Sequence, residues 1–206
     1  MKNNIVFSLL FLFSVTLWAQ TPSLYIPRDI QAAYQNGTRS YDGRPGKTYW
    51  SNHADYSINV SFDPTSRLLA GRAVITYHNE SPDTLDEIVM RLYADIFKKG
   101  TMRDWPANPD DLHDGVNIEF LSLDGNVRDL KAEDSRIQRQ GTNMFIELNE
   151  PLLPSTPLVI GVNWSFSLPE KSRLRMGMYD SSSFFIAYWY PQVAVYDDID
   201  GWDRYN

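Results

Sequence analysis

The strongest constraint on the fold is a period-two alternation of apolar and polar residues in two segments that are far apart in the chain. Residues 56–62 alternate in this way. Residues 158–166 alternate most regularly, with large apolar side chains at Leu158, Ile160, Val162, Trp164 and Phe166. Because successive side chains of a strand point to opposite faces, this period predicts half-buried β-strands.

Further strands are expected at residues 68–78, 85–93, 116–123 and 144–148. The turn Asp63-Pro64-Thr65-Ser66 joins the first two strands, with an Asp that can bond its own backbone and a Pro that fixes φ. Gly71 within the second strand predicts a bulge or the close approach of a neighbour. Short turns between the first three strands predict an antiparallel meander.

The remaining segments predict one more strand and two loops. Residues 184–195 are almost continuously apolar and aromatic, which predicts a strand buried on both faces. Residues 94–115 and 171–183 are rich in polar residues and predict surface loops. Seven or eight short strands without a strong helix predict an all-β fold, either an antiparallel β-sandwich or a saddle-shaped sheet.

The N-terminus predicts a secretory signal. Lys2 precedes an uncharged apolar run over residues 5–17, which is shorter than the about 20 residues that span a bilayer and typical of a signal peptide. We therefore expect a signal peptide at residues 1–19, an extended arm at 20–48 with a helical turn or two near 29–34, and a β-domain at 49–206. Export to the periplasm or the exterior of a Gram-negative bacterium would leave no membrane span after cleavage.

Composition excludes several classes of function. The net charge is -7, which argues against nucleic-acid binding because phosphate contacts need a Lys/Arg face. The absence of cysteine excludes disulfides, thiolate catalysis and cysteine-ligated metal. His53, His78 and His113 lie far apart in the sequence and outside any predicted helix, so their spacing does not match a helical zinc motif.

Three other patterns are interpreted mainly as structural. The run Asp198-Ile199-Asp200-Gly201 begins like a calcium loop but fits a turn, because the further oxygen ligands of a calcium loop do not follow. Residues 181–183 form a serine run without the strained G-x-S-x-G turn of a nucleophile, so a flexible loop is expected. The acidic residues 110, 111 and 114 fit a solvated loop.

Aromatic side chains near the C-terminus are the most suggestive candidates for binding. Tyr188, Trp189, Tyr190 and Trp202 are expected either to fill the core or to line a substrate cleft or sugar site. Trp202 and Tyr205 lie so close to the end of the sequence that we expect the 206 residues to be the N-terminal domain of a larger multidomain protein.

Two stretches resemble the N-terminal β-domain of bacterial zinc metallopeptidases related to aminopeptidase N and leukotriene A hydrolase. The first is Tyr49-Trp50-Ser51-Asn52-His53-Ala54-Asp55-Tyr56, continuing through Ile58, Val60, Phe62-Asp63-Pro64, Leu69, Gly71, Ile75, Tyr77, Asn79, Ser81-Pro82-Asp83, Leu85 and Leu92-Tyr93. The second is Tyr188-Trp189-Tyr190-Pro191-Gln192 with Tyr196-Asp197-Asp198 and Gly201-Trp202. The resemblance covers roughly residues 45–206.

The resemblance implies a saddle-like domain that lies over a thermolysin-like catalytic domain and helps to select peptide substrates. Zinc would be bound there by H-E-x-x-H and a downstream Glu, none of which appears in residues 1–206. No catalytic or metal residue is therefore transferred to this chain, which alone is expected to be inactive. Tyr188, Tyr190 and Gln192 are the substrate-cleft candidates. The alternatives are a non-catalytic interaction module and a carbohydrate-binding module.

Overall fold

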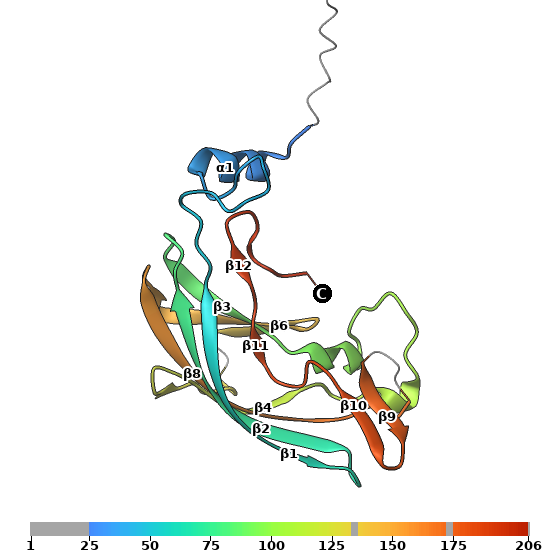
Figure 1. Cartoon of the computed structure of the whole chain (residues 1–206). Helices are drawn as coiled ribbons and strands as arrows, with labels where there is room; N and C mark the ends of the chain where they lie inside the picture. Colours follow the sequence, from blue (N-terminus) through green and yellow to red (C-terminus); the bar gives the residue numbers. More distant parts are fainter. Residues whose placement is uncertain (1–24, 133–135, 172–174, 206) are drawn as a thin grey trace, which may run out of the picture.

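The computed structural model describes residues 25–132, 136–171 and 175–205, and antiparallel sheets dominate them (Figure 1). The larger sheet has the strand order β1-β2-β8-β4-β5, with bounds β1 His53–Asp63, β2 Leu68–Asn79, β8 Thr156–Ser167, β4 Asn117–Leu123 and β5 Asn126–Val127. The second sheet has the order β11-β3-β7-β6, with bounds β11 Gln192–Val193, β3 Leu85–Arg91, β7 Asn143–Leu152 and β6 Ile137–Gln140. The all-β expectation is confirmed. Across the described ranges, no helix has the length and apolar character needed to cross a membrane.

The alternation in β8 places one face of the larger sheet in the core. All five of its large apolar side chains are buried, and Ile160 and Val162 are fully inaccessible. β2 pairs with β8 along its whole length, from Leu68 opposite Ser167 to Asn79 opposite Thr156. The β1–β2 hairpin turns as expected, because the Asp63 carboxylate accepts the Thr65 N–H at 2.9 Å.

Gly71 marks a close approach and not a bulge. Its register with both neighbouring strands is continuous, but a Cβ at this position would lie 2.5 Å from Cζ2 of the buried Trp164. The ring of Trp164 therefore occupies the space that any larger residue at position 71 would need.

The predicted meander is wrong, because β3 leaves β2 and joins the second sheet. The edge of β2 that a meander would use is paired with β8, whereas β3 pairs with β7 and β11. The buried Asn79 organises this crossing: its side-chain amide donates to the carbonyls of Asp83, Leu152 and Leu153 at 2.8, 3.3 and 3.2 Å. These contacts tie the end of β2 to the end of β7 and direct the chain into the other sheet.

The expectation of one continuous buried strand at 184–195 is also wrong. This segment forms β10 (Ser183–Ile186) and, after an irregular stretch, β11. Tyr188 has φ 54, a left-handed conformation that a bulky residue rarely adopts and that interrupts a strand. Apolar character alone did not reveal the break, and the side chains of Phe185 and Val195 are exposed.

The two expected surface loops contain ordered structure. Within 171–183, β9 (Met176–Asp180) pairs with β10 as a hairpin. The other segment, residues 94–115, contains two short 3₁₀-helices, Tyr93–Phe97, which begins one residue before it, and Pro109–Asp111; Ala94, Asp95 and Phe97 of the first are buried. The fully buried Asp95 accepts the Val116 N–H at 2.6 Å and an Arg139 N–H at 2.5 Å, which accounts for a carboxylate inside the fold.

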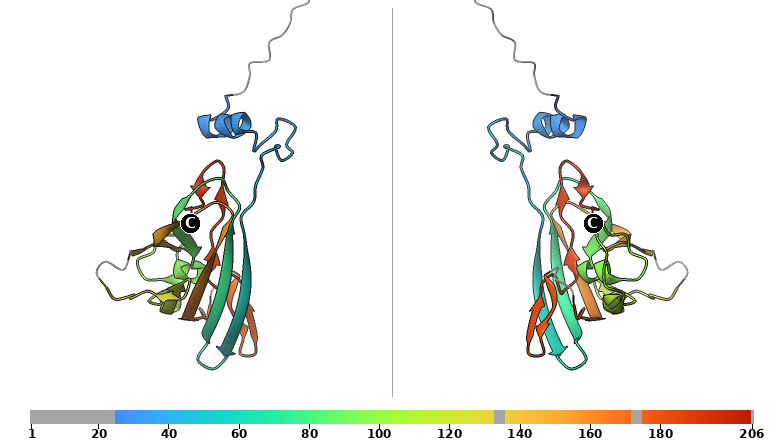
Figure 2. Two further views of the ribbon diagram at one scale, coloured as in Figure 1. Left: turned by 90° about the vertical axis from the view of Figure 1, so that its left-hand side faces the viewer. Right: turned by 90° about the vertical axis from the view of Figure 1, so that its right-hand side faces the viewer.

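A short helix precedes the sheets. α1 (Arg28–Asn36) ends at Gly37, whose φ of 74 fits the left-handed cap of a helix. Both side views place α1 beyond one end of the sheets, connected to β1 by an irregular segment (Figure 2). The arm is thus partly helical, as expected, and folded by turns where an extended course was expected. The proposed signal peptide at residues 1–19 lies outside the described residues.

Candidate functional site

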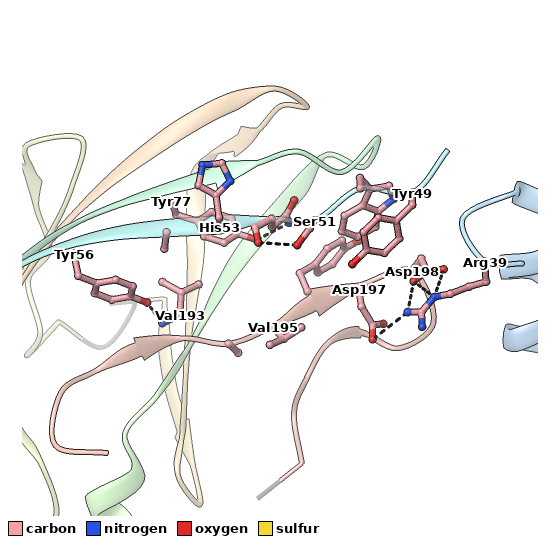
Figure 3. Close-up of a pocket in the computed structure, with 15 residues that line it drawn as sticks. Arg39, Tyr49, Ser51, His53, Tyr56, Tyr77, Val193, Val195, Asp197 and Asp198 are labelled. Atoms are coloured by element: carbon pink, nitrogen blue, oxygen red, sulfur yellow. Dashed lines mark hydrogen bonds and ion pairs between the residues drawn. The ribbon is translucent and has the colours of Figure 1, made fainter. Parts of the chain in front are cut away.

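A cavity of about 290 Å³ lies between the start of β1 and the segment that follows β11 (Figure 3). The N-terminal arm closes one end of it. Five aromatic side chains contribute to its wall, and three charged groups lie at the arm end; these residues are Tyr49, Trp50, Tyr56, Tyr77, Tyr196, Arg39, Asp197 and Asp198. The two stretches that carry the sequence resemblance therefore meet in space at this cavity.

Ring contacts hold the aromatic wall together. Trp50 stacks on Tyr196 with ring centroids 5.8 Å apart. Trp202, of the β12–β13 hairpin (β12 Tyr196–Asp197, β13 Gly201–Trp202), packs edge-on against Tyr196 at 5.2 Å and tilted against Tyr77 at 5.8 Å. Such pairs stabilise beyond their buried area. Trp202 is 5 % exposed, so its role is that of a core residue behind the wall.

The tyrosine hydroxyl groups are fixed by hydrogen bonds. The Tyr56 hydroxyl accepts the Val193 N–H at 3.0 Å, and the Tyr77 hydroxyl accepts from the Asn52 amide at 2.6 Å. Burial raises the pKa of both hydroxyls. Burial, together with the bond that it donates to Asp83, raises the pKa of Tyr196 to about 12.

All three hydroxyl groups are therefore neutral at physiological pH. Neutral phenols can donate and accept hydrogen bonds but are poor bases and nucleophiles. The wall is suited to holding a ligand by apolar contact and hydrogen bonds and not to covalent chemistry.

An ion pair fastens the arm at the charged end of the cavity. Arg39 donates to Asp198 through Nε at 3.0 Å and Nη2 at 2.6 Å, and the Thr38 hydroxyl donates to the same carboxylate. Burial opposes ionisation of Asp198, but the bonds from Arg39 and Thr38 outweigh it and lower its pKa. The hydrogen bond to Asp198 likewise raises the pKa of Arg39. Both groups are charged across the physiological range.

None of the predicted cleft residues lines the cavity. Tyr190 packs edge-on against Tyr56 at 5.5 Å and so stands behind the wall. Gln192 is in β11, opposite Arg91 of β3. Tyr188 lies on a different part of the surface, where Arg175 donates to its hydroxyl at 2.7 Å.

Sequence reasoning missed the arm's contribution to the cavity. Arg39 and Asp198 are separated by most of the chain, and no local pattern links them. Tyr56 and Tyr77 could have been found, because the alternation already places both on the inner face of the larger sheet.

The remaining sequence candidates have structural roles in the described residues. Asp197 accepts the N–H groups of Ile199 and Asp200 at 2.9 and 2.8 Å, which identifies the calcium-like run as a hairpin turn. The serine run lies at the turn between β9 and β10, where Ser182 donates to Asp180. The buried Asp111 accepts from the backbone at residues 170 and 171.

The structure brings two of the three histidines together. His53 and His78 are direct partners across the β1–β2 pair, whereas His113 is half-buried elsewhere and its Nδ1 accepts the Gly115 N–H at 2.9 Å. Burial lowers the pKa of His113. The helical spacing rule did not anticipate the pair, because an antiparallel hairpin can bring together residues at any separation in the sequence.

Comparison with known proteins gives a fold-level likeness. No protein-family model matches the chain, and no curated protein matches its sequence. Similar solved structures include an M1 zinc metallopeptidase from Deinococcus radiodurans at 13% identity and TM-score 0.39, over 62% of this chain and 23% of that chain. A mutant of that peptidase bound to a Tyr-Ser-Ala substrate is similar at 12% identity and TM-score 0.39, over 63% and 24% of the two chains.

A two-domain M1 zinc metallopeptidase mutant bound to L-tryptophan is similar at 13% identity and TM-score 0.39, over 67% of this chain and 25% of that chain. This chain thus spans about a quarter of the length of the peptidase chains that it resembles. A likeness of this size assigns no role to any residue.

Proposed function

We propose that this chain is the N-terminal β-domain of an exported zinc metallopeptidase, in which it covers the substrate cleft of a thermolysin-like catalytic domain and helps to select peptides. Zinc would be bound by the catalytic domain, outside residues 1–206. The observation that carries the proposal is the convergence of the two resembling stretches on one cavity.

Specific contacts support this convergence. The Tyr56 hydroxyl is bonded to the backbone of Val193, and Trp50 stacks on Tyr196. Residues that resemble the family in two distant parts of the sequence therefore form one surface. If the two stretches resembled the family for separate reasons, their residues would have no need to be in contact.

The chemistry of the cavity fits a binding role for this domain. Its wall offers aromatic surface and neutral hydroxyl groups, and Arg39 and Asp198 supply charges of both signs at one end. A peptide offers the matching groups, since it has apolar side chains, backbone donors and acceptors, and charged termini. Hydrolysis is assigned to the catalytic domain.

The test begins with the coding sequence beyond the codon for Asn206. An H-E-x-x-H motif with a Glu downstream is expected there, and the full-length protein should bind zinc and release amino acids from peptides in a chelator-sensitive reaction. A full-length protein that lacks peptidase activity, or that keeps it undiminished after metal removal, would refute the proposal.

A pair of variants of the full-length enzyme examines the role of this domain. Tyr49→Ala removes a half-exposed ring from the cavity wall, whereas Tyr25→Ala removes an exposed ring that lies outside it. We expect the first to raise KM several-fold with kcat little changed, as for loss of uniform substrate binding, and the second to change neither. Equal kinetics for the two variants would exclude the cavity from substrate selection.

A non-catalytic interaction or carbohydrate-binding module is the second candidate. Tyr188 favours it, because its ring is 43 % exposed, but the burial of Trp202 removes one of the rings on which a sugar could stack. Tryptophan fluorescence that responds to a polysaccharide would support this candidate, and a stop codon directly after Asn206 would favour it over the peptidase.

A further inference from the structure

The outer face of the β1–β2 hairpin holds a cluster of metal-ligating side chains. His53 and His78 are paired across the strands, with ring centroids 4.4 Å apart and ring planes 9° from parallel. Asp55 lies two residues after His53, so its side chain points to the same face of the sheet. The His78 Nε2 atom is 3.3 Å from an Asp55 carboxylate oxygen. One potential ligand atom from each residue lies within 4.8 Å of the others.

From this geometry we propose that His53, Asp55 and His78 form a binding site for a divalent transition-metal ion, with Zn²⁺ as the representative ion. Two imidazoles and one carboxylate are a donor set that first-row divalent ions accept. Three protein ligands leave further coordination positions for water, and the exposure of His53 and Asp55 gives solvent access to them.

The distances allow the site to close. Ligand atoms bound to Zn²⁺ at about 2.0–2.2 Å in a tetrahedron lie about 3.4 Å from each other. The pair formed by His78 and Asp55 is already at that separation. The stacked rings must rotate about their side-chain torsions to aim one nitrogen each at a common point, and little packing opposes this because His53 is exposed and His78 half-buried.

The local charge also favours a cation. Among the described residues, His78 is the only basic side chain within ion-pairing distance of Asp55, so no Lys or Arg competes for the carboxylate. No hydrogen bond from the described part of the chain holds the ring nitrogens of His53. His53 is one of the residues that line the cavity, but its ring projects away from the segment that carries Val193 and Val195 (Figure 3), so an ion held by the ring would lie on the opposite face of β1 from that segment.

An ion at this position would fasten the first residue of β1 to β2. The arm enters the sheet immediately before it, at Asn52, whose side chain donates to Tyr77 and accepts the N–H groups of Glu80 and Ser81. The metal would link β1 and β2 on the outer face, at the end of the hairpin where the hydrogen bonds of Asn52 already link them. The inferred role is to stabilise the entry of the arm and with it one wall of the cavity.

The experiment is a calorimetric titration of the purified 206-residue chain with ZnCl₂. We expect about one Zn²⁺ per chain and an increase in thermal stability on binding, because a ligand that binds only the folded state stabilises it. His53→Gln and His78→Gln should each weaken binding at least about tenfold, since even the loss of an outer-shell partner costs 10–100-fold in metal affinity.

The control is matched for charge. Asp55→Asn should weaken binding, whereas Asp86→Asn, which removes an exposed carboxylate from β3, should leave it unchanged. Circular dichroism of each variant establishes that it is folded. No binding by the folded wild-type chain, or binding that survives both histidine substitutions, overturns the proposal. Because the chain is titrated without any catalytic domain, the result does not depend on the proposed peptidase function.

Discussion

Substitution of Asp198 tests whether an ion pair holds the arm to the β12–β13 hairpin. The carboxylate accepts hydrogen bonds from Nε and Nη2 of Arg39 and from the Thr38 hydroxyl, and its side chain is 10 % exposed, against 38 % for Arg39. An exposed ion pair contributes about 0–1 kcal/mol, whereas loss of one partner of a buried pair costs about 3–5 kcal/mol. This pair lies between those limits. We expect Asp198→Asn to lower the free energy of arm opening by about 1–3 kcal/mol.

Hydrogen exchange of the arm amides follows this free energy. The N–H groups of Gly46 and Thr48 donate to the carbonyls of Thr38 and Gly37 at 2.9 and 3.1 Å, so both bonds lie within the arm, and we expect them to exchange faster when release from the hairpin lets the arm unfold. The expected loss corresponds to exchange that is roughly 5–150-fold faster, because 1.4 kcal/mol is a factor of ten.

The matched control is Asp200→Asn, in the same hairpin turn but without a side-chain bond to the arm. Its exchange rates should equal those of the wild type. A double-mutant cycle with Arg39→Ala should give a coupling energy of about 1–2 kcal/mol between Arg39 and Asp198. Unchanged exchange in Asp198→Asn, or the same acceleration in both variants, would refute the assignment of the arm's attachment to this pair.

Three further outcomes are expected. Because the pKa of Asp198 is held below its ordinary value of 3.8, its contribution is present above that value and lost as the pH falls through the lower folded-state pKa. The difference in arm opening between wild type and Asp198→Asn should therefore shrink as the pH falls below 3.8, and a constant difference would contradict this. Gly71→Ala should destabilise the fold by about 1–3 kcal/mol in urea unfolding, because the new Cβ overlaps Trp164, and an unchanged midpoint would show that the ring moves freely. Tyr56→Phe removes the acceptor of the Val193 N–H and should cost about 1 kcal/mol in the same measurement, which a neutral result would disprove.

The local elements could be predicted from the sequence because their signals are local. β8 is expected from alternation alone, and the strand that forms has all five large apolar residues buried. The turn at Asp63 follows from its own side chain, which bonds the backbone two residues on. Such features depend only on residues a few positions away, so the local sequence is enough to predict them.

The assignment of strands to sheets could not be predicted in the same way. A short turn after β2 is compatible both with a meander and with a crossing to the other sheet. The buried Asn79 decides between them through bonds to Leu152 and Leu153, which lie more than seventy residues away in the sequence. The break at Tyr188 could not be predicted either, because a run of apolar residues does not indicate the backbone conformation of any one residue in it.

The candidate site was predicted in part. The resemblance drew attention to residues 49–56 and 188–202, and the structure joins these two stretches at one cavity. The individual candidates Tyr188, Tyr190 and Gln192 do not line it. Tyr188 has a left-handed φ that interrupts the strand, and Tyr190 packs against Tyr56. The positions of Arg39 and of the histidine pair depend on contacts between distant parts of the sequence. Spacing rules for helices do not predict such contacts.

The pairing of β2 with β8 has a consequence for the order of events during folding. The β1–β2 hairpin contains only local contacts and can form as soon as residues 53–79 are present. The second edge of β2 stays unpaired until β8, which comes much later in the chain, is available to pair with it. Non-local pairings of this kind slow folding, and an unpaired edge can recruit another strand. A nascent chain therefore passes through a stage in which a completed hairpin presents an unpaired edge, and a chaperone that covers that edge would raise the folding yield without changing the final structure.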